Sequence, residues 1–337
     1  MVWHWFGTGF GDTPSGNFPS NFSASPPGRN LGAGAVGDTF RLRRGEVALV
    51  GRITPQVDYR AMFDIAKTGT GSGSVMQDLW VGYQLTKRMR IEVGQQKIPL
   101  SEEGNRANGL LLTVERAIMN EVPTGVGREG VQRDTGALLR YQSKFGNASL
   151  GIFNNVGVDQ NITSTDRQKF ATASAYLTAI RHVTLGVWGG AEIGDFRPRN
   201  NRERAGATLI VQGGPHFFES EFGYAHDHGV AGTPLQLNNY AAGGYALYAY
   251  TLSPKWQLVG RYDEWDPSIH GGTPLAGITV APGNHNLREY TFGFNYYMRS
   301  HNAKIQLNYI RDDVSVGGVN FFGKQRNVLL SNFQVAF

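Results

Sequence analysis

Segments of about ten residues in which apolar and polar side chains alternate recur along most of the chain. In residues 57–66, for example, Val57 and Tyr59 alternate with Asp58 and Arg60. Successive side chains of a β-strand point to opposite faces of the sheet, so each segment has one apolar and one polar face. A helix would distribute the same residues around its circumference. The alternation therefore predicts an all-β fold built from many two-faced strands.

Short and long connections alternate strictly between these segments. The short ones are Thr54-Pro55, Thr86–Arg88, Ser143–Gly146, Arg181-His182, Gly213–Pro215, Ser253–Lys255 and Arg299–His301. The long ones are Thr68–Ser74, Pro99–Arg133, Gly157–Arg167, Glu192–Asn201, Asp227–Leu237, Asp266–Asn284 and Asp312–Gln325. This arrangement is typical of a transmembrane, antiparallel up-and-down β-barrel of the bacterial outer membrane, with short periplasmic turns and long external loops.

The number of strands follows from parity. Fifteen segments between Phe40 and Phe337 read as strands, and the first and last of them both run toward the periplasm. One earlier strand in the opposite direction is needed to close a barrel, and residues 2–8 are the candidate, followed by an external loop at residues 9–38. We therefore expect about 16 strands in a single domain, residues 1–337, with 14 and 18 as alternatives.

Composition excludes several other classes of protein. No run of about 18 apolar residues is present, so the chain does not cross a membrane as a helix. The absence of cysteine excludes disulfides, zinc-thiolate sites and thiol nucleophiles. The net charge is +5, but the basic residues occur singly rather than in runs, so we expect no nucleic-acid partner. Residues 1–10 lack the features of a signal peptide, and we expect the native start to lie elsewhere.

Aromatic residues gather near the predicted short turns. They are Trp80, Tyr83, Tyr141, Tyr250, Trp256, Tyr296 and Tyr297. Amphipathic rings collect where hydrocarbon meets lipid headgroups, so we interpret them as an interfacial girdle. The alternative is that aromatic residues favour strands of any kind.

Four segments together resemble the phosphate-selective porin O and P family. They are FRLRRGEVALVG (40–51), VGQQKIPLSEE (93–103), VERAIMNEVPTGVGREG (114–130) and REYTFGFNYYM with KIQLNYI (288–310), in the family's order, whereas residues 1–37 match poorly. The chain also ends on an alternating strand with Phe337, which resembles the signal read by the outer-membrane assembly machinery. The resemblance implies a porin, a homotrimer, and phosphate as a candidate solute.

A porin needs a polar interior and a constriction. The constriction candidate is the segment 99–133, which is too long for a simple connection and which we expect to fold partly into the barrel; an external flap is the alternative. Its charged residues are Glu102, Glu103, Arg106, Glu115, Arg116, Arg128 and Arg133. The residues expected to line the pore and the anion path are Arg41, Arg43, Arg60, Arg90, Lys97, Arg140, Arg261 and Lys304. Arg41 and Arg43 break the alternation of the residues after them, which predicts a bulge near Arg44-Gly45.

Guanidinium groups keep their charge at physiological pH and bind oxyanions through several donors. The interior also carries acidic residues, so we expect a water-filled channel for passive diffusion of small hydrophilic solutes with a weak preference for anions such as phosphate. The expected partners are outer-membrane lipid, the solutes and two further copies of the chain, with other envelope proteins as a further option. A barrel that serves as a scaffold in a larger outer-membrane assembly is the alternative function.

Other chemistry finds little support in the sequence. His226 and His228 lack a third ligand that we can place, so we expect no metal. No serine and histidine pair has the arrangement of a hydrolase, so we assign no catalytic residue, no cofactor and no enzyme activity.

Overall fold

The computed structural model describes residues 2–10, 39–67, 75–121, 126, 133–154, 168–194, 202–227, 239–266, 269, 287–316, 319–320 and 326–336. Among these residues no helix is long and apolar enough to cross a bilayer. Sixteen long strands dominate the described residues, with a two-residue strand, β16 (Val319–Asn320), at the end of β15. The long strands are β1 (Val2–Phe10), β2 (Thr39–Arg52), β3 (Val57–Asp64), β4 (Met76–Gln84), β5 (Met89–Lys97), β6 (Arg133–Ser143), β7 (Gly146–Phe153), β8 (Lys169–Leu177), β9 (Val183–Ile193), β10 (Arg202–Gly213), β11 (His216–Asp227), β12 (Asn239–Ser253), β13 (Trp256–Asp266), β14 (Leu287–Arg299), β15 (Ala303–Val316) and β17 (Arg326–Val335).

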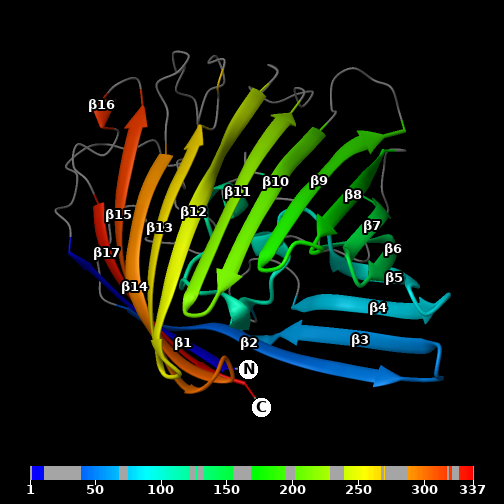
Figure 1. Cartoon of the computed structure of the whole chain (residues 1–337), viewed down its shortest axis with the longest axis horizontal. Helices are drawn as coiled ribbons and strands as arrows, with labels where there is room; N and C mark the ends of the chain where they lie inside the picture. The colour runs from blue at the N-terminus through cyan, green and yellow to red at the C-terminus, as the bar shows by residue number, and fades with distance from the viewer. Residues whose placement is uncertain are drawn as a thin grey trace.

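Every long strand pairs antiparallel with its neighbours in sequence, as expected for an up-and-down barrel (Figure 1). The first strand also pairs with the last, from Val2 opposite Val335 to Phe10 opposite Asn327, so the pairings form a ring. The structure has β1 at residues 2–10, where parity predicted a strand, and most of the external loop expected at residues 9–38 lies outside the described residues. The register of β1 against β2 shifts at Arg43, next to the predicted bulge.

The burial pattern is the inverse of that in a water-soluble protein. In β13, Leu258 is 49% exposed on the outer face, whereas Arg261 and Asp263 are buried on the inner face. The same alternation leaves Val93, Leu150 and most other large apolar residues of the wall exposed. Apolar side chains face outward because the surrounding phase is hydrocarbon, and polar side chains face the interior.

Hydroxyl side chains hold several of the short turns. Thr54 Oγ1 accepts hydrogen bonds from the main-chain N–H groups of Gln56 and Val57, and Thr86 Oγ1 accepts from the N–H groups two and three residues later. Ser143 and Ser253 each accept from the N–H group two residues later. A hydroxyl in this position closes a tight turn without needing backbone partners from outside it.

The aromatic girdle is only partly as expected. Tyr83 and Tyr141 are exposed on the outer face near short turns. Trp80, however, lies opposite Arg60 in the register and beneath the guanidinium group of Arg90, 5.0 Å from the ring centre, on the inner face. It is three residues from Tyr83, and an odd separation places two strand residues on opposite faces.

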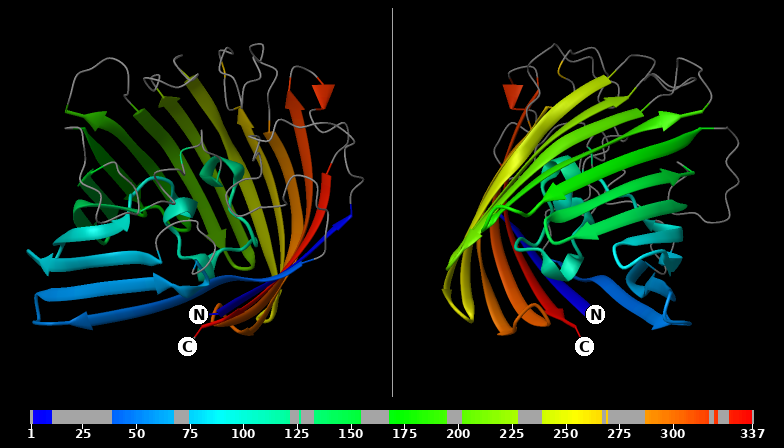
Figure 2. Two further views of the ribbon diagram at one scale, coloured as in Figure 1. Left: turned by 180° about the vertical axis from the view of Figure 1, so that it is seen from behind. Right: turned by 45° about the vertical axis from the view of Figure 1, so that its right-hand side comes forward.

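The connection between β5 and β6 folds into the ring of strands, where its short helices are visible in both views of Figure 2. These are α1 (Glu102–Asn105), the 3₁₀ turn η2 (Asn108–Leu110) and α2 (Ile118–Glu121); a further 3₁₀ turn, η1 (Ile65–Lys67), follows β3. We call residues 98–121 the inner loop. Its position excludes the external flap for this part of the predicted constriction.

Replacing Phe292 on the outer face of central β14 with arginine is expected to lower the free energy of unfolding by about 2–4 kcal/mol, because a charge at mid-depth loses its hydration. The same change at Met298, outward but at the turn end of β14, should cost about 0–1 kcal/mol. Denaturant titration in phospholipid vesicles measures both. Equal losses at the two positions would contradict this orientation of β14 in the bilayer.

Candidate functional site

The first helix of the inner loop is bound by a carboxylate of the barrel wall. Glu221 of β11 accepts hydrogen bonds from the main-chain N–H groups of Glu102 (2.7 Å) and Glu103 (3.0 Å) and from Ser101 Oγ (2.8 Å). Ser101 Oγ in turn caps the N–H group of Gly104 at 3.0 Å. The first N–H groups of a helix have no partner within the helix, so Glu221 supplies what α1 itself lacks.

A second carboxylate on β11 binds the end of the same helix. Arg106 forms a two-pronged ion pair with Glu219, at 2.6 and 2.8 Å, and Tyr245 Oη lies within hydrogen-bond distance of both Glu219 and Glu221. Burial alone would lower the pKa of Arg106, but the charge of Glu219 raises it above its ordinary value. Burial raises the pKa of Glu102, against the opposing effect of Arg106. The guanidinium of Arg106 thus stays charged where it is held.

Arg261 of β13 forms the centre of a second anchor and is only 3% exposed. Its guanidinium contacts three carboxylates: Asp263 at 2.7 Å, Glu289 at 3.2 Å and Glu103 of the loop at 3.4 Å. It also donates to Thr113 Oγ1 at 2.8 Å and to two main-chain carbonyls of the loop. One side chain therefore ties the wall to both halves of the inner loop.

Polar side chains of β14, β15 and β17 bind the main chain of residues 109–114. The contacts are Lys304 Nζ to Leu111 O at 2.6 Å, Gln306 to Leu111 O at 3.2 Å, Asn295 to Leu112 O at 3.0 Å, Gln334 to Gly109 O at 3.2 Å, and Val114 N to Asn308 Oδ1 at 2.7 Å. Main-chain groups removed from water need such partners. This stretch of loop is thereby attached along its length.

A histidine in the turn between β14 and β15 adds to this attachment. His301 Nδ1 lies 3.2 Å from Gly109 O. Burial, together with the positive charge of Lys304, lowers the pKa of His301 to about 4. His301 is therefore neutral at pH 7 and adds no charge to this part of the interior.

Apolar side chains of the loop also pack against the inner wall. Leu100 and Met119 of the inner loop, and Val126 further along the same connection, belong to one buried cluster with wall residues that include Phe170 and Trp265. Inward-facing apolar side chains on β6 to β13 are unusual in a polar barrel interior, and their partners are these loop residues. The apolar part of the inner wall is therefore covered by the loop.

The wall of β3 to β6 carries a different arrangement, in which arginines alternate with carboxylates. Asp78 lies between Arg60 (2.8 Å) and Arg133 (2.6 Å). Asp58 binds Arg90 through both oxygens at 2.5 and 2.6 Å. Val50 of β2 pairs with Arg60 in the register and therefore also lies on the inner face. Its side chain is nevertheless 66% exposed. This part of the inner wall therefore remains accessible.

Arg140 is the most exposed guanidinium of this row. Glu92 accepts from Arg90 Nε at 3.0 Å and from Arg140 Nε at 2.9 Å. The side chain of Arg140 is nevertheless 45% exposed, and within the described residues only its Nε has a hydrogen-bond partner. Four arginines here face three carboxylates, an excess of one positive charge. Arg140 keeps its terminal nitrogens available to an anion.

Several residues expected to line the pore instead hold the loop. Arg261 and Lys304 face inward but are buried beneath the inner loop, and Glu103, Glu115 and Arg116 are buried within the loop itself. Lys97 binds three loop carbonyls, of residues 104, 105 and 106, at 3.0–3.4 Å. The pore-lining role expected for Arg261 and Lys304 is wrong in this structure, because alternation gives the face of a strand and not what covers it.

The remaining candidates fall into two groups. Arg60, Arg90 and Arg140 lie together on the accessible wall. Arg133, at the start of β6, is buried against Asp78. The backbone of Arg41 and Arg43 lies at the loop end of β2, opposite β1, and Arg128 is outside the described residues. Strict alternation would place Lys97 and Arg90 on opposite faces. Between them Gly94 has a φ of +133°, a backbone conformation that favours glycine, and beyond it Lys97 reaches the loop.

Sequence reasoning missed the residues that surround Glu221, namely Ser101 of the inner loop and Thr208 and Tyr245 of the wall. One signal was present: Glu219 and Glu221 occupy inward positions two apart, and buried carboxylates require donors. At the other histidine candidate, His226 stacks on Tyr240 with ring centres 4.0 Å apart and lies 3.3 Å from Glu203. His228 is outside the described residues.

Comparisons with known proteins agree with this architecture. The sequence profile of the phosphate-selective porin O and P family matches residues 29–206 and 200–337. No curated protein sequence matches the chain. Among solved structures, OmpT of Vibrio cholerae in a trimer form has a TM-score of 0.61 at 10% identity and covers 99% of this chain and 96% of its own. The outer membrane channel DcaP of Acinetobacter baumannii gives 0.59 at 12%, covering 98% and 94%. A porin refined at 1.8 Å gives 0.58 at 12%, covering 98% of each chain.

Replacing Arg261 with methionine should detach the inner loop, because it leaves Asp263, Glu289 and Glu103 buried without their common partner. We expect the free energy of unfolding to fall by about 3–5 kcal/mol. Hydrogen exchange of residues 98–121 should accelerate in the folded barrel. Arg288→Gln is the matched control, because its ion pair with Glu264 on the outer face is about 40% exposed and should contribute less than about 1 kcal/mol. Unchanged loop exchange in the Arg261 variant would contradict the anchor.

Proposed function

The chain belongs to the phosphate-selective porin O and P family and is therefore a porin of the bacterial outer membrane. We propose that solutes pass between the inner loop and the wall of β3 to β6. The observation that carries this proposal is the contrast between the two walls. Polar side chains of β11 to β17 are buried under the loop, whereas Val50, Arg60 and Arg140 stay exposed on the inner face. Water and solutes therefore meet the second wall.

The proposed channel prefers anions weakly. An arginine with free terminal nitrogens, such as Arg140, attracts an anion and offers it donors in a planar fork. The carboxylates of Asp58, Asp78 and Glu92 neutralise most of the row, however, so a small excess of charge remains. Such a row gives a weak preference for anions in general, phosphate included, and not the specific binding of a single solute.

The inner loop is the proposed constriction. Its main chain is bound to β11, β13, β14, β15 and β17, so it occupies the interior as a fixed body. A constriction that sets a size limit needs this rigidity, because a mobile loop would admit solutes of varying size. The channel works by diffusion and involves no chemical step.

Reconstitution in a planar bilayer should give stepwise conductance, with a reversal potential in a salt gradient that favours anions. Replacing Arg140 with glutamine should reduce the anion-to-cation permeability ratio by roughly twofold to fourfold. This corresponds to the energy of about 0.4–0.8 kcal/mol that one charge exerts at 5–10 Å in water. The effect should shrink at high ionic strength.

Two controls separate the parts of this proposal. Arg288→Gln removes a charge from the outer face and should leave the ratio unchanged. An absence of conductance in the wild type would refute the channel itself. Conductance with a ratio unaffected by Arg140→Gln would refute only the proposed path along β3 to β6.

We further propose that the protein is a homotrimer, supported by its family and by its likeness to the V. cholerae protein described in a trimer form. Native mass spectrometry of detergent-extracted protein should give three times 36.9 kDa, apart from bound lipid and detergent. A species of one or two chains as the only folded form would contradict the trimer.

A further inference from the structure

The short turns at one end of the barrel carry cations and no acidic residue. None of the seven turns contains Asp or Glu. Their lysines and arginines are Lys87, Arg88, Lys144, Arg181, Lys255 and Arg299. Within the described part of the chain, none of these six has a carboxylate within ion-pair distance. The arginines of the interior, by contrast, are paired. Cations without a carboxylate partner at a membrane surface call for anions from outside the protein.

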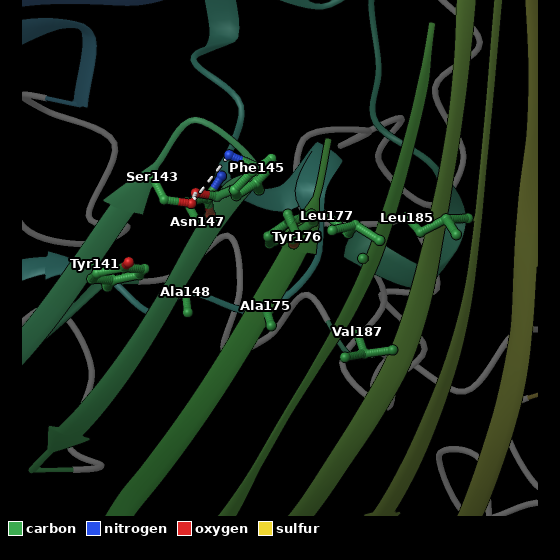
Figure 3. A pocket seen from close by; sticks show the side chains of 12 residues that line it. Tyr141, Ser143, Phe145, Asn147, Ala148, Ala175, Tyr176, Leu177, Leu185 and Val187 are labelled. Carbon is green, nitrogen blue, oxygen red and sulfur yellow. Dashed lines mark hydrogen bonds between the residues drawn. The ribbon is translucent and has the colours of Figure 1, made fainter. Parts of the chain in front are cut away.

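Beside two of these turns, the outer face of the wall contains an apolar hollow of about 430 Å³ (Figure 3). Cross-strand register explains it. One row across the sheet reads Tyr141, Ala148, Ala175 and Val187, and the two alanines in its middle leave a gap between larger neighbours. The next row toward the turns reads Ser143, Gly146, Leu177 and Leu185, which extends the gap to the end of the barrel.

The floor of this hollow is fixed by close backbone packing. Gly146 has a φ of +151°, and a Cβ atom there would lie 1.9 Å from Tyr176 O of the neighbouring strand. Behind the hollow, on the inner side, Gly186 lies against the ring of Tyr176, where a Cβ atom would be 2.4 Å from it. A larger side chain at Gly146 would collide with the backbone of the neighbouring strand, so the hollow stays open at that position.

A cation lies at the edge of the hollow nearest the turns. Lys144 Nζ is 4.8 Å from the centre of the Phe145 ring, and Phe145 lines the hollow. Arg181 belongs to the next turn, which joins Leu177 to Leu185, two further lining residues. Its Nε donates to His182 at 2.9 Å. Both cations are exposed. An apolar cavity thus opens beside two positive charges at the headgroup level.

We propose that this hollow binds an anionic phospholipid of the periplasmic leaflet, with an acyl chain along Ala148 and Ala175 and the phosphate at Lys144 and Arg181. The chemistry matches at both ends, because the hollow is apolar within the hydrocarbon region and basic where the headgroups begin. The remaining turn cations contribute a less specific attraction around the rim. A second protein chain would need carboxylates at this level to satisfy the same charges.

Native mass spectrometry of the detergent-extracted protein, titrated with phosphatidylglycerol or phosphatidylcholine, tests the proposal. The wild type should retain phosphatidylglycerol more tightly. Lys144→Gln and Arg181→Gln should each weaken its binding by about fivefold. Filling the hollow with Ala148→Leu or Ala175→Leu should weaken binding to a similar degree while all cations remain.

Matched variants elsewhere on the outer face serve as controls. Lys255→Gln removes a cation from another turn, and Ala246→Leu enlarges an exposed outer-face alanine of β12. Both should bind phosphatidylglycerol as the wild type does. Circular dichroism and single-channel conductance confirm that each variant is folded.

Three results would overturn the proposal. Equal retention of the two lipids would show that the cations do not select a headgroup. Binding that survives Ala148→Leu and Ala175→Leu would show that the hollow holds no acyl chain. A change of oligomeric state in the alanine variants with lipid binding unchanged would show that a second copy of the chain occupies the hollow.

Discussion

Main-chain polar groups of the inner loop that have no partner within the loop need one elsewhere, and the inner wall supplies several. Glu221 accepts from the N–H groups at the start of α1, Arg261 donates to carbonyls near α2, and Lys304 and its neighbours bind the stretch between. Unpaired main-chain groups away from water are costly, so the loop lies against the part of the wall that carries most of these donors and acceptors. This position of the inner loop leaves the wall of β3 to β6 accessible.

The positive charges of this protein form two groups, one in the interior and one at the short turns, and the two groups differ in whether carboxylates lie beside them. Arginines of the interior are held by carboxylates such as Asp58, Asp78 and Asp263, which fixes their positions and limits the field that they produce. At the turns the chain contains no carboxylates, so the charges there act outward. The distribution of the acidic residues therefore matters more than the net charge of +5.

Much of the barrel could be predicted because strand alternation and connection length are local properties. Parity alone located β1 at the N-terminus. The covering of Arg261 and Lys304 could not be predicted, since it depends on where the inner loop folds, and Val114 meets Asn308 across 194 positions of sequence. Trp80 shows that closeness to a turn does not by itself predict the face on which a side chain lies. Its position near a turn suggested the outer face, but it lies an odd number of residues from Tyr83 and therefore faces inward.

The inner loop precedes in sequence nearly all of the wall that receives it. Its partners on β11, β13 and β17 lie 119, 145 and 225 positions later in the sequence, and the ring of strands is closed where β17 pairs with β1. Contacts between such distant residues form late, because closing a long loop is entropically costly. The final strands thus have two tasks during assembly: they seal the barrel, and they fix the loop that narrows it.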